Sequence, residues 1–270
     1  MGRKYEFEIN VLSDKGKRKK ANEDSVFANA ISTEKGNYGL FAVADGVGGT
    51  ELGKYASNLA TERLTKWWNE NLPRYLDKNN ILDEVTNDLK LEAELMNIKI
   101  IEASNSFGKS MATTLSLMFI ANKEASIIHI GDSRVYKINK AQIEMLTEDH
   151  SWVEMQVKSG AMTREEAEKH KNRHAILRCL GAKTECQLYL NRCEVKKNDC
   201  FLLCTDGFYR YFADHELIEK LMNSEIDYES QTEMLESMLM EIYEKGASDN
   251  ISAILVRIKG KEMKLAWWKN

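Results

Sequence analysis

The sequence predicts an α+β fold, in which helices form layers around antiparallel β-sheets. Predicted strands follow one another along the chain, and so do predicted helices, so the strict strand–helix alternation of a doubly wound parallel sheet is missing. The chain of 270 residues contains one proline. A Pro-rich linker is therefore absent, which favours one compact domain.

The first predicted elements are two strands followed by two helices. A short strand is expected at residues 25–28, and a stronger one at residues 38–44, where the run YGLFAVA is almost wholly apolar. Apolar residues then recur at helical spacing over residues 51–71 and again over about residues 80–104. Pro73 lies between these helices and ends the first of them.

The rest of the chain is expected to begin with a β-meander of three strands and to end with a mixture of strands and helices. Residues 148–171 are polar and helical, with a turn at Gly160, which is typical of an inserted segment rather than of core. The meander strands are expected at residues 112–120, 125–130 and 134–138, later strands at 200–204 and 251–258, and later helices at 215–223 and 231–244.

Charge and apolar run lengths exclude two classes of protein. Lys and Arg number 38 and Asp and Glu number 42, which gives a formal net charge of −4 and argues against a nucleic-acid-binding protein. The N-terminal residues lack the apolar region of a signal peptide, and every apolar run is far shorter than the ~20 residues of a membrane span. We therefore expect a cytoplasmic protein with reduced thiols.

Two local patterns are expected to be structural. The cysteines lack the CxxC or Cys/His spacing of a zinc site, so buried, inert thiols are expected. The pair Trp267-Trp268 is expected to pack in the core, with contact to a membrane or a partner as the alternative. The cysteines are Cys179, Cys186, Cys193, Cys200 and Cys204.

Four acidic sites lie where a predicted strand begins or ends. A carboxylate at the end of an apolar strand is partly desolvated and needs a partner, and no matching set of arginines or lysines stands beside these sites in the sequence. Each site alone has the pattern of a turn or loop, but together they predict a site of oxygen ligands, which Mg²⁺ or Mn²⁺ prefers. The sites are Glu23-Asp24, Asp45, Asp206 and Asp249-Asn250.

Eight motifs in one order resemble the metal-dependent PP2C-type (PPM) serine/threonine protein phosphatases, and the helical stretch after DHS resembles the flap of the bacterial branch. The match runs from about residue 8 to residue 258. The motifs are ANEDS (21–25), VADGVGG (43–49), GKSMATT (108–114), GDSR (131–134), LTEDHS (146–151), LRCLG (177–181), LLCTDG (202–207) and SDNIS (248–252).

The resemblance implies a four-layer α-β-β-α sandwich, two antiparallel sheets flanked by helices, with metal ions in a cleft between the sheets. It implies a phosphatase domain over residues 1–260, with a small helical flap at about 148–175, and a C-terminal tail at 261–270.

The resemblance also implies the roles of the acidic residues. Asp45 would bridge two metals and the Gly46 carbonyl would bind one of them, while Asp206 and Asp249 would hold the other. The remaining positions that match the family are Glu23 and Asp24, an acidic pair that binds directly or through water; Asp132, which with the Asp206 position holds a third metal in bacterial members; and Asn250, a supporting group beside Asp249.

The implied reaction is the hydrolysis of phosphoserine and phosphothreonine monoesters with two, or three, Mn²⁺ or Mg²⁺ ions. A hydroxide that bridges two of the ions would attack phosphorus, with Asp45, Asp206 and Asp249 as the catalytic ligands. The implied partners are phosphorylated proteins, namely a Ser/Thr kinase and its substrates.

Two positions depart from the family. Lys19 stands where the family usually has the arginine that grips the substrate phosphate, so either Lys19 serves or Arg18 takes its place from the next position. Val47 stands where eukaryotic members often have a histidine, as in many bacterial members.

Two alternatives compete with a phosphatase. Residues 48–54 fit the GxxxxGK pattern of a P-loop nucleotide-binding protein, but Tyr55 stands where that motif needs a Ser or Thr hydroxyl. A catalytically inactive PP2C-fold binding module is the other, and it is disfavoured because all the expected carboxylates are present.

Overall fold

Two antiparallel β-sheets form the centre of the computed structural model, which describes residues 5–47, 51–222 and 228–260. The first sheet has the order β1-β11-β10-β7-β8, and the second has the order β2-β3-β5-β6-β9 with β4 paired to β3. The strands are β1 Tyr5–Asp14, β2 Asp24–Ser32, β3 Asn37–Val47, β4 Ala112–Thr113, β5 Leu115–Ala121, β6 Glu124–Ile130, β7 Arg134–Ile138, β8 Ile143–Met145, β9 Tyr189–Glu194, β10 Cys200–Cys204 and β11 Ile251–Gly260.

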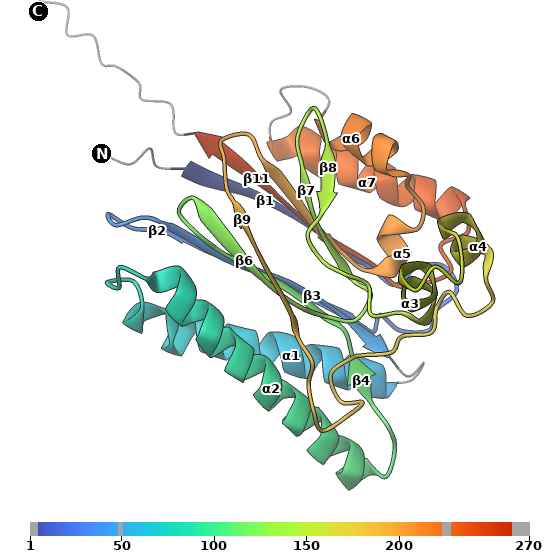
Figure 1. The fold of residues 1–270 in the computed structure, drawn as a ribbon. Coiled ribbons are helices and arrows are strands. Elements are labelled where there is room, and N and C mark those ends of the chain that lie inside the picture. Colours follow the sequence, from blue (N-terminus) through green and yellow to red (C-terminus); the bar gives the residue numbers. More distant parts are fainter. Residues whose placement is uncertain (1–4, 48–50, 223–227, 261–270) are drawn as a thin grey trace, which may run out of the picture.

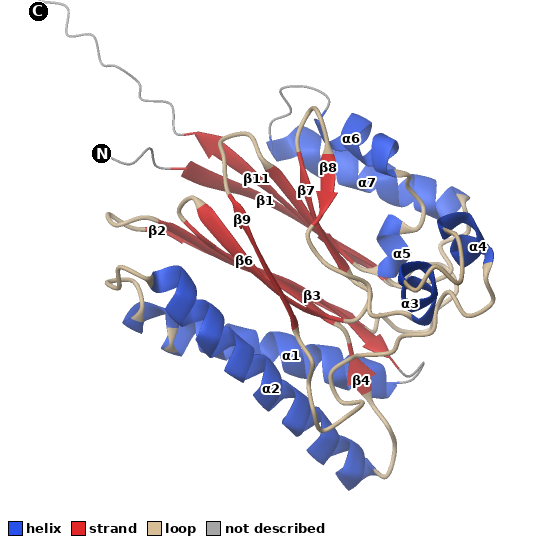
Figure 2. Cartoon of the chain, viewed as in Figure 1, coloured by secondary structure: helices blue, strands red, loops and turns tan. Residues whose placement is uncertain are grey.

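Helices cover the outer face of each sheet (Figures 1 and 2). Helices α1 and α2 pack on the second sheet, and α6 and α7 pack on the first, which confirms the predicted four-layer sandwich. Two short helices, α3 and α4, lie at the end of the sandwich where β3 ends. The helices are α1 Glu51–Glu70, η1 Leu72–Arg74, α2 Ile81–Phe107, α3 Trp152–Lys158, α4 Arg164–Lys169, α5 Asp206–Tyr209, α6 Asp214–Met222 and α7 Tyr228–Glu244.

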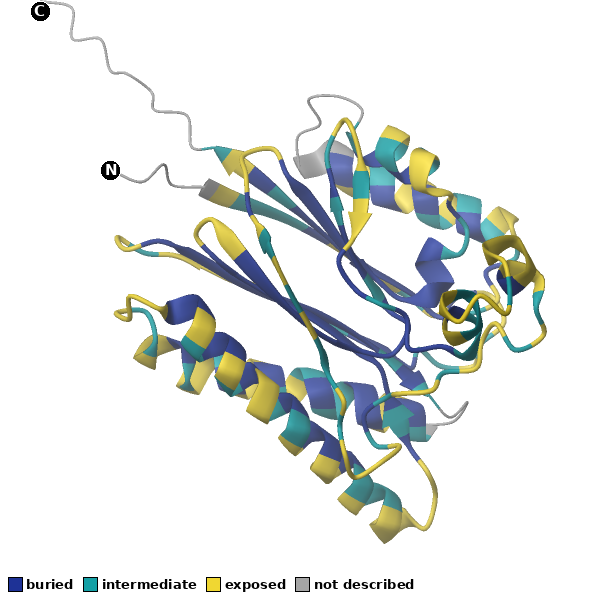
Figure 3. Cartoon of the chain, in the orientation of Figure 1, coloured by how far each residue is buried: buried dark blue, intermediate teal, exposed yellow. Residues whose placement is uncertain are grey.

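Three apolar layers hold the sandwich together. Successive side chains of a strand point to opposite faces, so Leu40 packs under α1 and α2 while Phe41 packs between the two sheets. On the other sheet, Leu202 packs under α6 and α7, and Leu203 packs between the two sheets. The central strands are thus buried on both faces (Figure 3), which explains why their sequences are continuously apolar.

The predicted meander is wrong in its third strand. Strands β5 and β6 pair as expected, but β7 leaves that sheet and pairs with β10 and β8 in the other. The chain crosses through residues 131–133, where Gly131 has a positive φ of 120°. The alternation of apolar residues identifies a strand but does not say which sheet it joins, and β1, β8 and β9 were not predicted at all.

The topology brings the ends of five strands to one end of the sandwich. Strands β2 and β3 pair so that Asp24 lies opposite Asp45, and β7 and β10 pair so that Arg134 lies opposite Cys204. Strand β11 begins at Ile251 beside the same end of β10. Within the described ranges, no helix has the length and apolar character to cross a membrane.

Candidate metal and phosphate site

Six carboxylates meet where these strand ends come together. Asp24 and Asp45 face each other across β2 and β3, and Glu23 directly precedes β2. Asp132 precedes β7, Asp206 follows β10 and Asp249 precedes β11. The negative charges of the other four aspartates all act on Asp45. Glu23, Asp24, Asp132 and Asp206 are buried, and Asp45 and Asp249 are half-buried. The structure therefore brings together every acidic residue that the sequence nominates.

Burial and mutual repulsion make this cluster a poor place for bare negative charge. Burial, followed by the charges of Asp206 and Asp249, raises the pKa of Asp24 to about 7. Burial and the Asp206 charge raise the pKa of Asp132 to about 8, against the opposing effect of Arg210. The pKa values of Asp45 and Asp206 are also raised, chiefly by burial. Cations are needed to keep these groups ionised together.

Three carboxylate oxygens in the cluster point to a divalent cation as the missing partner. Asp24 Oδ1, Asp132 Oδ1 and Asp206 Oδ1 are buried and have no hydrogen-bond partner among the described residues. Buried polar atoms without a partner are rare, and a bound ion can supply the missing contact. An all-oxygen donor set fits Mg²⁺ or Mn²⁺.

Cationic side chains hold three of the carboxylates as the structure stands. With these cations in contact, no group of three Asp, Glu, His or Cys side chains among the described residues has the spacing to bind one metal ion. Lys19 Nζ lies 2.5 Å from Asp249 Oδ1, and Arg210 contacts both Asp206 and Asp132. The partners come from Lys19 and Arg210, which the fold brings to the acidic sites.

Lys19, and not Arg18, reaches the cluster. Burial opposes the positive charge of Lys19, but its hydrogen bond to Asp249 and the charges of Asp45 and Glu23 raise its pKa above the ordinary value. Arg18 is exposed, and its guanidinium lies near Gly246 instead.

Arg210 is the functional candidate that the sequence analysis missed. Its Nη1 lies 2.9 Å from Asp206 Oδ2, and its Nη2 lies 3.7 Å from Asp132 Oδ2. The same Nη1 also bonds His174 Nδ1, on the loop that follows α4. Arg210 lies four residues after Asp206, at the end of the helical turn α5. This i,i+4 spacing is the sequence signal that could have identified Arg210.

Asn250 ties the basic loop to the acidic cluster. Its Oδ1 accepts a hydrogen bond of 2.9 Å from the Glu23 N–H, and its Nδ2 donates bonds of 2.9 Å to the carbonyl oxygens of Lys15 and Ala21. The loop that carries Lys19 is thereby held at the start of β11, next to Asp249. This geometry suits the supporting position expected for Asn250.

The backbone at Asp45 and Gly46 is held in place from two sides. The Asp45 N–H donates to Thr114 Oγ1 at 2.9 Å, and the Asp45 carbonyl accepts from Thr113 Oγ1 at 2.9 Å. On the other side, a Cβ atom added to Gly46 would lie 2.4 Å from the carbonyl of Gly53 in α1. Only glycine allows this close approach, which fixes the direction of the Gly46 carbonyl.

Comparison with known proteins decides the family. The family model described as Protein phosphatase 2C matches residues 15–254 of the chain. The chain belongs to the protein phosphatase 2C family. This phosphatase 2C chain is a metal-dependent serine/threonine protein phosphatase.

Bacterial serine/threonine phosphatases resemble this phosphatase 2C chain over almost its whole length. Protein phosphatase PhpP of Streptococcus pneumoniae is 30% identical over 94% of this chain and 99% of its own. The serine/threonine phosphatase of S. agalactiae has a TM-score of 0.82 at 28% identity, covering 93% of this chain and 99% of the other. The catalytic domain of PstP, in complex with two manganese ions, has a TM-score of 0.76 at 26% identity, covering 94% and 98%.

The remaining sequence patterns of this phosphatase 2C chain have structural outcomes. Gly53 and Lys54 lie inside α1, and with the family known the P-loop interpretation is not favoured; residues 48–50 lie outside the described residues, as do Trp267 and Trp268. All five cysteines are free. Cys200 and Cys204 are buried, and burial raises the pKa of the Cys200 thiol to about 12, which keeps it protonated and unreactive.

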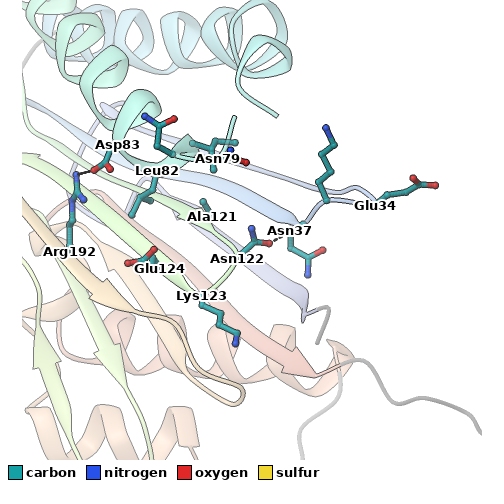
Figure 4. Close-up of a pocket in the computed structure, with 14 residues that line it drawn as sticks. Glu34, Asn37, Asn79, Leu82, Asp83, Ala121, Asn122, Lys123, Glu124 and Arg192 are labelled. Atoms are coloured by element: carbon teal, nitrogen blue, oxygen red, sulfur yellow. Dashed lines mark hydrogen bonds and ion pairs between the residues drawn. The ribbon is translucent and has the colours of Figure 1, made fainter. Parts of the chain in front are cut away.

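Two cavities flank the sandwich at opposite ends. One of about 600 Å³ lies by the start of β3 and is lined by residues such as Asn37, Asp83 and Arg192 (Figure 4). Its side chains pair with one another, as in the contact of 2.5 Å between Arg192 and Asp83. The other, of about 810 Å³, adjoins the acidic cluster at Asp132 and runs between α3–α4 and α5–α6.

Proposed function

We propose that this phosphatase holds two divalent ions, Mn²⁺ or Mg²⁺, at Asp45, Asp206 and Asp249, and uses them to hydrolyse phosphoserine and phosphothreonine in proteins. The observation that carries the proposal is the buried acidic cluster with its unpartnered oxygens at Asp24 and Asp206. Two such ions, when bound, lower the pKa of a water molecule between them and neutralise charge on the phosphoryl oxygens.

Each carboxylate has its own task in this proposal. Asp45 is central to the cluster and is assigned to both ions, with the Gly46 carbonyl beside it. Asp206 begins α5, Asp249 lies just before β11, and the charges of both act on Asp45. Asp24 Oδ2 accepts a hydrogen bond of 2.9 Å from Thr205 Oγ1, which leaves Oδ1 for an ion or for water bound to it. Glu23 completes the same side of the site.

Lys19 is assigned to the substrate phosphate. With Asp249 occupied by an ion, the Lys19 ammonium group becomes available to a phosphoryl oxygen at the mouth of the cluster. Val47 carries no proton to donate, so the serine or threonine oxygen that leaves takes its proton from water in the cleft.

The substrate polypeptide is assigned to the cavity beside Asp132. Its walls combine charged groups of both signs with apolar groups of Val153, Tyr211 and Phe212, a mixture that suits an extended polypeptide segment. Three of its arginines are paired with carboxylates, and among the described residues that line it Arg173 is the cation left to face a charged substrate: the paired ones are Arg134, Arg164 and Arg210. Residues 148–175, which form one wall, are assigned as the flap of a phosphatase domain over residues 1–260. A Ser/Thr kinase and its substrates, in the cytoplasm, are the partners that this chemistry requires.

The test is hydrolysis of p-nitrophenyl phosphate and of a phosphothreonine peptide, with Mn²⁺, with Mg²⁺ and with EDTA. We expect turnover with either ion, none in EDTA, and a loss of at least about 100-fold in Asp45→Asn and Asp206→Asn, because each removes an ion's ligand. Asp77→Asn, an exposed aspartate paired with Lys35, is the control and should keep full activity. Turnover that persists in EDTA would overturn the proposal, as would full activity of Asp45→Asn.

A further inference from the structure

Arg210 is fixed in the acidic cluster from several directions. Its backbone N–H donates to the Asp206 carbonyl at 3.3 Å, so the turn of α5 places it directly over Asp206. Its guanidinium then contacts Asp206 and Asp132 on one side and His174 on the other. The side chain is 24% exposed. Arg210 is thus a largely buried residue of the cleft, in contact with its carboxylates, and not an exposed surface residue.

The residue before Arg210 is locked as well. The guanidinium of Arg134 lies 3.8 Å from the centre of the Tyr209 ring, and Arg134 is itself paired with the buried Asp149. Tyr209 cannot turn without disturbing this stack. The backbone that presents Arg210 is therefore held in place by this stack.

Arg210 contacts the pair of carboxylates that the family resemblance assigns to a third metal. Its two terminal nitrogens lie 2.9 Å from Asp206 Oδ2 and 3.7 Å from Asp132 Oδ2. A guanidinium does not lose its proton in a protein, so its charge is permanent. A divalent ion between the same two carboxylates would have to displace this charge or bear its repulsion at close range.

We propose that Arg210 takes the place of the third ion, so that this phosphatase binds two divalent ions and not three. The inference rests on the two-ion site of the proposed function. The two are compatible, because Arg210 uses Oδ2 of Asp206 and leaves the unpartnered Oδ1 for an ion. Arg210 supplies one positive charge where a metal would supply two, and it cannot be removed by a chelator.

The test counts Mn²⁺ ions bound per chain by equilibrium dialysis with elemental analysis, over 1 µM to 10 mM total metal. We expect two ions in the wild type. Arg210→Gln should gain a third ion, at least tenfold tighter than any third binding in the wild type, and the double variant Arg210→Gln/Asp132→Asn should lose it. Arg173→Gln removes the same charge from the same cavity without touching Asp132, and it should bind two ions like the wild type.

A second variant keeps the test decisive even if Arg210→Gln folds poorly. Asp132→Asn in the wild-type background should still bind two ions, because neither of them uses Asp132. A wild type with three ions that falls to two in Asp132→Asn would overturn the role of Arg210, as would a folded Arg210→Gln that still binds two. A wild type that binds fewer than two ions and lacks phosphatase activity would instead contradict the proposed function.

Discussion

Lys19 points into the acidic cluster, whereas its neighbour Arg18 lies outside it, and this difference predicts their roles. Lys19→Ala should raise KM for p-nitrophenyl phosphate about tenfold, which corresponds to about 1.4 kcal/mol of lost phosphate binding, with a smaller effect on kcat. Arg18→Ala is the matched control and should leave both constants within about twofold. Steady-state kinetics at saturating Mn²⁺ measures both. A larger increase of KM in Arg18→Ala than in Lys19→Ala would show that Arg18, and not Lys19, binds the substrate phosphate.

His129 is a single residue whose protonation couples the fold to pH. It is fully buried in β6, its Nε2 donates to the Glu148 carbonyl at 2.9 Å, and its Nδ1 bonds Ser116 Oγ at 2.8 Å. Burial, together with the nearby His150, lowers the pKa of His129 to about 3. Its contribution to stability is thus present above about pH 6.5 and is lost as the pH falls toward 3.

We therefore expect the free energy of unfolding to fall more steeply between pH 6.5 and pH 5 in the wild type than in His129→Gln. The difference should reach about 1.6 kcal/mol, since one group contributes at most about 1.4 kcal/mol per pH unit and the unfolded histidine is half protonated at about pH 6.5. Urea denaturation at several pH values and constant Mn²⁺ gives the two slopes. Equal slopes of the free energy of unfolding against pH in the two proteins would mean that His129 does not cause this pH dependence.

At the scale of elements, Arg134 at the start of β7 joins three segments that are distant in the sequence. It makes a two-pronged ion pair with Asp149, with contacts of 2.7 and 3.0 Å, donates to Tyr136 Oη at 2.8 Å, and lies over the Tyr209 ring. The segment before α3, helix α5 and β7 itself are linked through this one side chain.

Arg134→Gln should therefore destabilise the protein by about 3 kcal/mol, because it leaves the buried Asp149 carboxylate without its partner. Lys99→Gln breaks an exposed ion pair with Glu102 and should change stability by less than about 1 kcal/mol. Urea denaturation of the two variants compares them directly. Equal effects would show that the Arg134 pair contributes no more than a surface contact.

The sequence predicted the elements better than it predicted their pairing. Long apolar runs located β3, β5, β10 and β11. Carboxylates at the ends of β3, β10 and β11 indicated the site, because a charge beside an apolar strand is costly unless a cation or a hydrogen bond compensates it. Strand β1 has the usable signal of Phe7, Ile9 and Val11 alternating with polar residues. The sheet that β7 joins, and the position of Arg210 over Asp132, depend on contacts between distant segments. No local pattern contains that information.

At the scale of the whole molecule, the proposed ions would bind where both sheets end, so they should stabilise the entire sandwich. Binding to the folded chain alone adds about 2.7 kcal/mol per site when free metal is 100 times Kd. We expect Mn²⁺ to raise Tm in the wild type and in Asp77→Asn, and to have a much smaller effect in Asp45→Asn. Thermal denaturation with Mn²⁺ and with EDTA measures this. An equal rise of Tm in Asp45→Asn would show that Mn²⁺ stabilises the protein without binding to the carboxylate cluster.

The pairing of β1 with β11 has a mechanical consequence. Tyr5 lies opposite Gly260, and the two strands run antiparallel from there toward Asp14 and Ile251. A force that pulls these two residues apart would break the hydrogen bonds between β1 and β11 one after another from this end. It would not load all of them at the same time. The sandwich should therefore yield at low force when pulled by these ends, and β1 should peel away before the strands that carry Asp45 and Asp206 are disturbed.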